Sequence, residues 1–390
     1  MGQYYTVIYS WIKLFIINNW EYPIEKVNKM ELVDQAKGSL QNQLEIIKRE
    51  IKSLPEPEFY ELNRRSTLQI SAAVAVDAGQ SLFGGILREM GIMLLQVASS
   101  EDETPESYVF WMNPILQEED KKKQIKDQLD MLVEEDEMTR DFVKAMGWNK
   151  ITEDKVMPKG CYVEISALGN FVRELLEWAK LYKTALLLKD LYRRLPNIQP
   201  VLLRDGMLRF DNMGEAHAKR LSKVFKSIGI PLLGVSKTSK FLRSPLITMW
   251  LKHHGIFNRK GAFLIKLDPE IFEELDYRLE RYFGVEGSMR FGRYVIVRFD
   301  SLPGSRNIFA IDVPHYYFDS ESSFDNLLVI LSGVSEHSTA TSYPTPGYPY
   351  ALKKAHDRVV FTKDKLYLLE NTLRRSLPPE VYDMLKSLEI

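Results

Sequence analysis

The chain has 390 residues, 45% of them hydrophobic, and its 52 basic residues are balanced by 53 acidic ones. This length suffices for one large domain or two ordinary ones, and the balanced charge excludes bulk electrostatics as a reason to expect a polyanionic partner. The single cysteine, Cys161, excludes disulfides and cysteine-based zinc sites, so we expect a cytoplasmic protein.

The N-terminal segment, residues 1–65, is expected to be a helical extension that docks on the body of the protein or on a partner. Residues 4–17 are apolar and aromatic, but they are too few to span a bilayer and lack the features of a signal peptide, so we expect no membrane association. Residues 21–55 have apolar side chains spaced three and four apart, which predicts an amphipathic helix.

A buried strand is predicted within residues 72–81, where an apolar run ends at Asp77 and Gly79 follows two residues later. A carboxylate at such a position usually has a charged partner or holds a metal. The small residues Ala78 and Gly79 leave room beside Asp77 for a ligand or a neighbouring backbone. The alternative is an ordinary capping or turn aspartate at the end of a strand.

Two more strands are predicted at residues 82–87 and 91–98, which would complete a three-stranded antiparallel meander. Residues 99–160 then change character, because runs of charged residues surround a short apolar group near residues 129–132. This pattern predicts an exposed, acidic, helical insertion rather than part of the core.

The next predicted elements are a long helix at 166–194, a strand at 200–205 that ends in Asp205-Gly206, a helix at 214–228 and a buried strand at 231–237. With the meander, they have the element order of a ribonuclease H-like α/β core, in which helices flank a mixed sheet. We assign this core to residues 66–240. That fold holds divalent metals between carboxylates of its first strand, first helix and fourth strand.

Residues 241–390 are expected to form a C-terminal extension with a second sheet region. Strands are predicted at 263–267, 294–299 and 308–313, and helices at 324–331, 351–359 and 363–377.

The acidic side chains of the predicted core suggest metal-dependent chemistry. Hard cations such as Mg²⁺ and Mn²⁺ prefer oxygen ligands, and two such ions can activate water and stabilise a leaving oxygen of a phosphodiester. Glu174 and Glu177 lie on one turn of the long helix and are candidates to join Asp77 and Asp205, with Glu164 a weaker one. We favour Glu177, although an ion pair with Arg173, four residues earlier, would also explain it.

Two further stretches carry candidate binding or catalytic residues. Residues 216–266 contain eleven basic residues and no acid, which favours a polyanion contact over a solvated surface. Within this stretch Lys237, Lys240 and Arg243 follow the last core strand, so we expect them to contact the polyanion. Near the C-terminus, His356 lies on a predicted helix with Tyr348 just before it. The pair either packs in the fold or contacts the scissile phosphate and shuttles protons.

These pieces, in this order, resemble the NurA nuclease family. The similarity rests on Val74-Ala75-Val76-Asp77-Ala78-Gly79, the helix with Arg173 and Glu177, the strand that ends in Asp205-Gly206, Gly234-Val235-Ser236-Lys237, and the spacing of eight from Tyr348 to His356. It spans about residues 70–375. One departure is Asp77-Ala78-Gly79, where the family usually has Asp-Gly-Ser. Another is the long acidic insertion.

The resemblance implies a manganese-dependent (or magnesium-dependent) deoxyribonuclease that degrades DNA ends in repair or in anti-phage defence. Asp77, Glu177 (or Glu174) and Asp205 would be metal ligands, and Tyr348 and His356 the remaining catalytic pair. NurA-like proteins form homodimers around a DNA channel and dock on a HerA-type hexameric ATPase. Residues 241–390 would then complete the active site and the channel. The alternative is a non-catalytic scaffold subunit that binds nucleic acid; another ribonuclease H-like activity, such as slicing or transposition, lacks its accessory domains here.

Overall fold

The computed structural model describes residues 29–62, 70–83, 91–151, 157, 159–210, 215–236, 239–268, 292–300, 307–338 and 346–388. The chain divides into two compact units, residues 1–54 and 55–390. In the first unit the structure describes one long helix, α2 (Lys29–Ser53). This helix confirms the amphipathic helix expected within residues 21–55, whereas the apolar segment at 4–17 lies outside the described residues.

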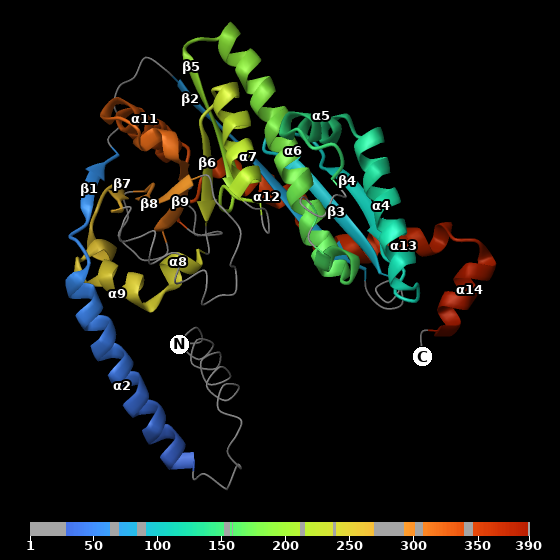
Figure 1. The fold of residues 1–390 in the computed structure, drawn as a ribbon, viewed down its shortest axis with the longest axis horizontal. Coiled ribbons are helices and arrows are strands. Elements are labelled where there is room, and N and C mark those ends of the chain that lie inside the picture. The colour runs from blue at the N-terminus through green and yellow to red at the C-terminus, as the bar shows by residue number, and fades with distance from the viewer. Residues whose placement is uncertain are drawn as a thin grey trace. The chain divides into compact units, whose positions relative to one another are not determined.

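The second unit is built on a sheet, to which the described residues contribute nine strands in the order β1-β7-β8-β9-β6-β5-β2-β3-β4 (Figure 1). The strands are β1 (Glu58–Glu61), β2 (Ile70–Leu82), β3 (Ile92–Ser99), β4 (Glu106–Trp111), β5 (Ile198–Asp205), β6 (Leu232–Ser236), β7 (Phe263–Lys266), β8 (Gly292–Arg298) and β9 (Phe309–Pro314). The sheet is mixed, because β2, β5 and β6 run parallel while the other neighbouring pairs are antiparallel.

Helices cover both faces of this sheet (Figure 1). They are α4 (Glu118–Glu135), α5 (Glu137–Met146), α6 (Ile165–Arg194), α7 (Glu215–Ile228), α8 (Lys240–Arg243), α9 (Pro245–His253), α11 (Glu321–Glu336), α12 (Tyr350–Val359), α13 (Lys363–Ser376) and α14 (Pro379–Leu388), with short 3₁₀ turns at Lys159–Tyr162, Ile256–Asn258 and His315–Phe318.

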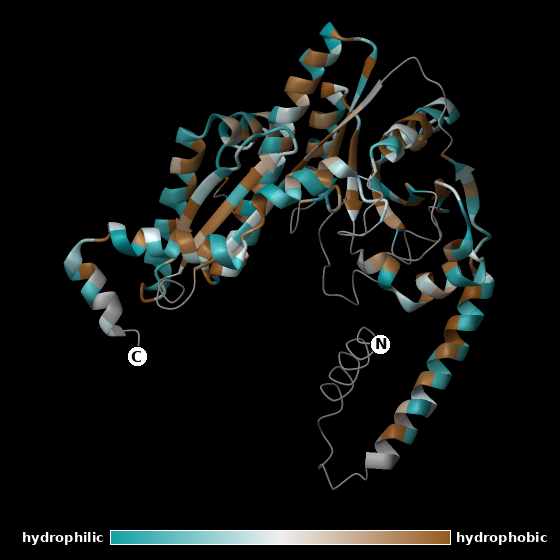
Figure 2. Ribbon diagram, turned by 180° about the vertical axis from the view of Figure 1, so that it is seen from behind, coloured by the Kyte–Doolittle hydropathy of each residue, from teal (hydrophilic) through white to brown (hydrophobic). Residues whose placement is uncertain are grey.

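Alternating side chains of the central strands build two separate hydrophobic cores. Val74, Val76 and Ala78 of β2 join the core formed with α4, α5, α6 and α7. Ala75 points to the opposite face, where the core is completed by α11 and α12. This two-residue period places Asp77 on the same face as Ala75, towards α12. The brown, apolar colour of the central strands reflects their burial on both sides (Figure 2).

The meander was predicted with one strand misplaced. Residues 70–82 form a single long strand, β2. The third strand of the meander is β4 (Glu106–Trp111), which pairs with β3 and lies within the segment expected to be helical. Residues 84–87, assigned to a separate strand, lie outside the described residues. The short run at 106–111 was missed because its burial is partial and it lies between acidic stretches.

The predicted insertion at 99–160 is helical in part, but the expectation that it stays outside the core was wrong. Ile125 and Leu129 of α4 and Phe142 of α5 are fully buried in the core with α6. Two acidic residues of the segment also pair with the core. The Nζ atom of the largely buried Lys180 of α6 lies 2.8 Å from Oδ2 of Asp102 and 2.9 Å from Oε1 of Glu106.

The C-terminal strands were located correctly but do not form a second sheet. β7, β8 and β9 extend the same sheet, because β9 pairs with β6. Residues 58–61, counted in the N-terminal extension, form the edge strand β1 beside β7. α14 was not predicted. Across the residues that the structure describes, no helix combines the length and apolar character needed to cross a membrane.

Candidate active site

Asp77 and Asp205 are neighbours on parallel strands. The register pairs Val76 of β2 with Arg204 of β5, so the next residue along each strand is one of the two aspartates. Because side chains alternate between the faces of a sheet, both carboxylates point to the face that α12 covers. The Asp77 side chain is nearly buried, and Asp205 is partly exposed. The sequence predicted Asp77 at the end of its strand, but this residue lies inside β2, and only Asp205 ends its strand. The register of β2 with β5 brings the two acids together.

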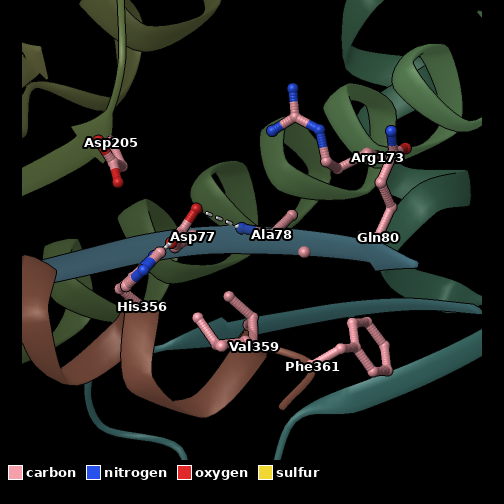
Figure 3. A pocket seen from close by; sticks show the side chains of 10 residues that line it. Asp77, Ala78, Gln80, Arg173, Asp205, His356, Val359 and Phe361 are labelled. Carbon is pink, nitrogen blue, oxygen red and sulfur yellow. Dashed lines mark hydrogen bonds and ion pairs between the residues drawn. The ribbon is translucent and has the colours of Figure 1, made fainter. Parts of the chain in front are cut away.

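His356 of α12 completes a compact cluster with the two aspartates (Figure 3). Its Nδ1 atom lies 2.8 Å from Oδ2 of Asp77, while Oδ1 of Asp77 accepts a hydrogen bond from the backbone amide of Ala78 at 2.8 Å. Asp77, Asp205 and His356 each offer one atom that could bind a metal, and these three atoms lie within 4.8 Å of one another. Three groups from β2, β5 and α12 thus converge on one point.

Gly79 explains how α12 approaches β2 so closely. A Cβ atom at this position would lie 2.2 Å from the carbonyl oxygen of Val359, at the C-terminal end of α12. No side chain fits there, because real Cβ atoms do not approach backbone oxygen so closely. The sequence predicted space beside Asp77 for a ligand or a neighbouring backbone. At Gly79 that space is occupied by the backbone of Val359. In the same helix, the Arg358 side chain donates hydrogen bonds to the carbonyl oxygens of Ser99 and Ser100. These bonds anchor α12 to the end of β3.

Tyr348 lies beneath the cluster and is fully buried against Phe309, with ring centroids 5.9 Å apart. Its hydroxyl group interacts with the Asp205 carboxylate, and burial together with the charges of Asp205 and Asp77 raises the pKa of Tyr348 well above its ordinary value. The phenol therefore stays protonated at any ordinary pH.

Glu177 lies in an ion pair beside the cluster rather than in it. Its carboxylate is fully buried and receives two hydrogen bonds from Arg204, from Nε at 3.1 Å and from Nη2 at 3.2 Å. Burial raises the pKa of Glu177, and the charge of Asp77 acts in the same direction, while Arg204 and Arg173 oppose them. Glu174 is also close to Arg204, at 3.8 Å.

Arg204 therefore organises the α6 side of the site, and the sequence analysis did not single it out. Its guanidinium group stacks over Trp178, 4.6 Å from the ring centroid, and donates to the carbonyl oxygens of Met207 and Arg209 just beyond Asp205. The signal was available, since a charged residue directly before Asp205 in a buried strand needs an acidic partner.

A pocket of about 290 Å³ opens beside the cluster. Asp77, Asp205 and His356 border it, as do Arg173 and Phe361, which the sequence analysis assigned no place in a site. Glu164 is the residue that precedes α6 and does not border the pocket.

The three basic residues expected to bind DNA are only partly described. Lys237 lies outside the described residues, and Lys240 begins the short helix α8 directly after the β6 region, without a described side chain. Arg243, at the end of α8, is exposed.

The cluster fits a divalent cation by the chemistry of its donors. Two carboxylates suit a hard ion such as Mn²⁺ or Mg²⁺, which favours oxygen donors. The short separation of the donor atoms allows the two carboxylates to hold one ion, with the imidazole beside it.

Comparison with known proteins identifies the family. A model of the NurA domain matches residues 119–361, more than half of the chain, so the chain belongs to the NurA family. No curated protein shows a significant match.

Solved structures show distant similarity. The NurA nuclease from Sulfolobus solfataricus is 13% identical over 90% of this chain and 99% of its own, with a TM-score of 0.39. A NurA structure with manganese (13% identity, 89% and 98% coverage, TM-score 0.32) and one bound to dAMP and manganese (13%, 92% and 97%, 0.31) are similar at a comparable level.

Proposed function

We propose that this protein is a divalent-metal-dependent nuclease that hydrolyses phosphodiester bonds in DNA. The observation that carries the proposal is the cluster of Asp77, Asp205 and His356, whose ligand atoms lie within 4.8 Å of one another beside an open pocket. Membership of the NurA family supports the same activity.

Each residue of the cluster has a role that its surroundings support. Asp77 and Asp205 would hold the metal, Mn²⁺ or Mg²⁺, which supplies charge stabilisation and an activated water when bound. His356, oriented by Asp77, would donate a hydrogen bond or a proton to a phosphate oxygen. Tyr348 would hold the Asp205 carboxylate in place. Glu177 would be a third metal ligand if its carboxylate binds the metal while it stays paired with Arg204.

The arrangement of strands supports a ribonuclease H-like core. The segment β4-β3-β2-β5-β6 has three parallel central strands, β2, β5 and β6, and an antiparallel pair at one side, with α6 connecting β4 to β5. In chain order, β2 is the first strand of this segment and β5 is the fourth. A ribonuclease H-like fold would hold metal at acidic residues on these two strands, where Asp77 and Asp205 lie.

The family resemblance extends the proposal to partners. We expect a cytoplasmic homodimer that encloses a DNA channel and docks on a HerA-type hexameric ATPase, with a role in DNA-end repair or anti-phage defence. Lys237, Lys240 and Arg243 are the residues we expect to line the path of the DNA.

A second candidate is a non-catalytic scaffold subunit that binds nucleic acid. The observation that favours it is the ion pair of Glu177 with Arg204, which occupies the helix carboxylate that a full metal site would use.

The deciding experiment incubates the purified protein with linear and circular DNA in Mn²⁺, Mg²⁺ or EDTA, with and without a HerA-type ATPase. A nuclease degrades linear DNA in the presence of metal and stops when EDTA is added. DNA binding without cleavage in every condition would favour the scaffold. Size-exclusion chromatography with light scattering tests the dimer.

A further inference from the structure

We propose that Asp312, a buried aspartate of β9, is a positioning residue for the metal ligand Asp205. Asp312 holds the turn that follows Asp205 at the end of β5, and through this turn it keeps the Asp205 carboxylate in place for a divalent cation. The inference rests on the proposed nuclease function, because it concerns the same metal site.

Asp312 is a charged residue in the interior of the sheet. Its side chain is fully buried, and the other residues of β9 are all apolar and buried as well. A carboxylate is seldom found in such a place unless its oxygens meet hydrogen-bond donors. One donor is the backbone amide of Leu208, whose nitrogen lies 2.8 Å from Oδ2 of Asp312. The acid therefore binds the chain three residues after Asp205.

Two glycines leave the space that the Asp312 carboxylate occupies. A Cβ atom at Gly292 of β8 would overlap Oδ1 of Asp312. Gly234 of β6 is the direct partner of Asp312 in the ladder between β6 and β9, and a Cβ atom there would overlap the carbonyl oxygen of Gly206 in the turn. Because neither glycine has a side chain, the carboxylate and the turn can approach each other closely.

Asp312 approaches the turn from the side of the sheet opposite to the metal-binding atoms. The strand registers place Arg204, Gly234 and Asp312 in one row across β5, β6 and β9. Arg204 points towards α6, where it pairs with Glu177, so the row faces α6. Asp205 is the next residue along β5 and faces α12. Asp312 therefore acts on Asp205 through the backbone and not as a metal ligand itself.

The turn after Asp205 is held through both its carbonyl and its amide groups. Arg204 donates to two carbonyl oxygens of residues 207–209, and Asp312 accepts from the amide that lies between them. Gly206 begins the turn with a φ of 121°, a backbone conformation that glycine adopts readily and other residues avoid. Because Asp205 directly precedes this turn, the position of its carboxylate depends on where the turn is held.

Replacement of a residue that supports a metal ligand typically weakens metal binding or activity by about 10–100-fold. Removing the Asp312 carboxylate leaves the buried Leu208 amide without this acceptor, so the turn has to move to find another partner. The Asp205 carboxylate must then be brought back into place before it can bind a cation. The cost of doing so should be measurable as weaker metal binding.

The test titrates the full chain with Mn²⁺ in the absence of DNA, so that no cleavage is needed. Electron paramagnetic resonance measures the free ion and gives the dissociation constant. We expect Asp312→Ala to weaken Mn²⁺ binding by about 10–100-fold. Asp312→Asn keeps an oxygen that can accept a hydrogen bond from the Leu208 amide, so it should restore most of the affinity.

Gly234→Ala is an independent variant on another strand. Its new Cβ atom would displace the turn at Gly206, so it should also weaken Mn²⁺ binding. Circular dichroism checks the fold of both variants, and one folded variant of the two is sufficient for the test.

Gln128→Ala is the matched control. Gln128 is also buried and bonded to backbone groups, because it accepts from the amide of Trp111 at 3.0 Å and donates to its carbonyl oxygen at 2.8 Å. These bonds lie at the β4 edge of the sheet, away from the turn. Gln128→Ala should therefore lower the melting temperature without changing the affinity for Mn²⁺.

The outcomes separate this inference from the proposed function. If a folded Asp312→Ala or Gly234→Ala variant binds Mn²⁺ as wild type does, the positioning role is excluded while the nuclease proposal stands. The same conclusion follows if Gln128→Ala loses as much affinity as Asp312→Ala, or if Asp312→Asn restores none of it. If the wild-type protein binds no Mn²⁺, the proposed metal site is wrong and the inference fails with it.

Discussion

The imidazole of His356 contacts the carboxylate of Asp77 at 2.8 Å, although 279 positions separate the two residues in the chain. The contact joins helix α12 to the central strand β2. It adds an imidazole to the two carboxylates that the parallel strands β2 and β5 supply to the candidate active site. Most of the tests of the proposed chemistry concern this helix and the two strands beneath it.

Asp77→Asn and Asp205→Asn should each abolish cleavage while leaving the fold and DNA binding intact. Each substitution removes a ligand charge with little change in shape, and the metal and its activated water are lost with it. Cleavage of linear DNA in Mn²⁺ measures the effect, and circular dichroism checks the fold. Asp357→Asn, a partly exposed carboxylate paired with Lys353 on α12, is the matched control and should remain active. Wild-type rates in either aspartate variant would remove that residue from the metal site.

His356→Ala should reduce cleavage by about 10²–10⁴-fold, the usual contribution of a positioned acid–base group, with little change in melting temperature. The side chain is 28% exposed and contributes little to packing, so a structural role would predict the opposite pattern. Rates per folded molecule and thermal melts are measured on the same preparation. A variant that melts much earlier but cuts normally would show that His356 is structural.

Glu177→Gln should destabilise the metal-free protein by about 3–5 kcal/mol, because it removes the closer of the two carboxylates that pair with the buried Arg204. If Glu177 is also a metal ligand, the rise in melting temperature on adding Mn²⁺ should be smaller in this variant than in wild type.

Glu174→Gln is the comparison, since Glu174 lies farther from Arg204, at 3.8 Å. We expect it to keep the full Mn²⁺-induced shift. A reduced shift in Glu174→Gln and a full one in Glu177→Gln would assign the metal ligand to Glu174 instead.

Tyr348 should contribute to an alkaline instability of the protein, and Tyr348→Phe should remove that contribution. Its folded-state pKa is raised by burial and by the nearby carboxylates. Above the ordinary tyrosine pKa of about 10, the unfolded chain loses this proton while the folded chain keeps it. Stability is therefore fully present below about pH 10 and falls by about 1.4 kcal/mol per pH unit above it, until the folded-state pKa is reached. Thermal melts of wild type and Tyr348→Phe between pH 8 and 11 should converge as pH rises; parallel curves would contradict the shift.

Lys240→Ala with Arg243→Ala should weaken DNA binding and reduce the slope of log K against log salt by about 0.7–0.9 for each phosphate that the variant no longer binds. Both residues belong to α8, which follows the last parallel strand of the sheet. Lys121→Ala, on the acidic helix α4, should leave the slope unchanged. An unchanged slope in the double variant would make these side chains ordinary solvated residues.

The sequence predicted the two aspartates because each follows an apolar run that marks a buried strand. Asp205 does end its strand, but Asp77 lies inside β2, which continues to Leu82 because its second half pairs with β3. The parallel pairing of β2 with β5 brings the two acids together. The helix of His356 was also visible, but not its contact with Asp77, because that depends on the close approach that Gly79 permits.

What the sequence could not reveal depends on long-range partners. Lys180 of α6 pairs with Asp102 and Glu106 and turns an acidic stretch into part of the folded body, while the charge pattern alone predicted a solvated insertion. Likewise, Arg204 of β5 forms an ion pair with Glu177 of α6. The spacing of residues within α6 predicts only the pair of Glu177 with Arg173, so this partner could not be predicted from that spacing. The strands after residue 262 were recognised, but the pairing of β6 with β9 decides that they extend one sheet.

The distance in sequence between Asp77 and His356 also orders events during synthesis. A ribosome adds about 5–20 residues per second, so roughly 14–56 s pass between the addition of Asp77 and the addition of His356, 279 residues later. For that interval the growing chain carries first one aspartate and then both, without the imidazole of α12. Any reaction that requires all three groups is therefore absent from a nascent chain until nearly the whole sheet and its last covering helices have been made.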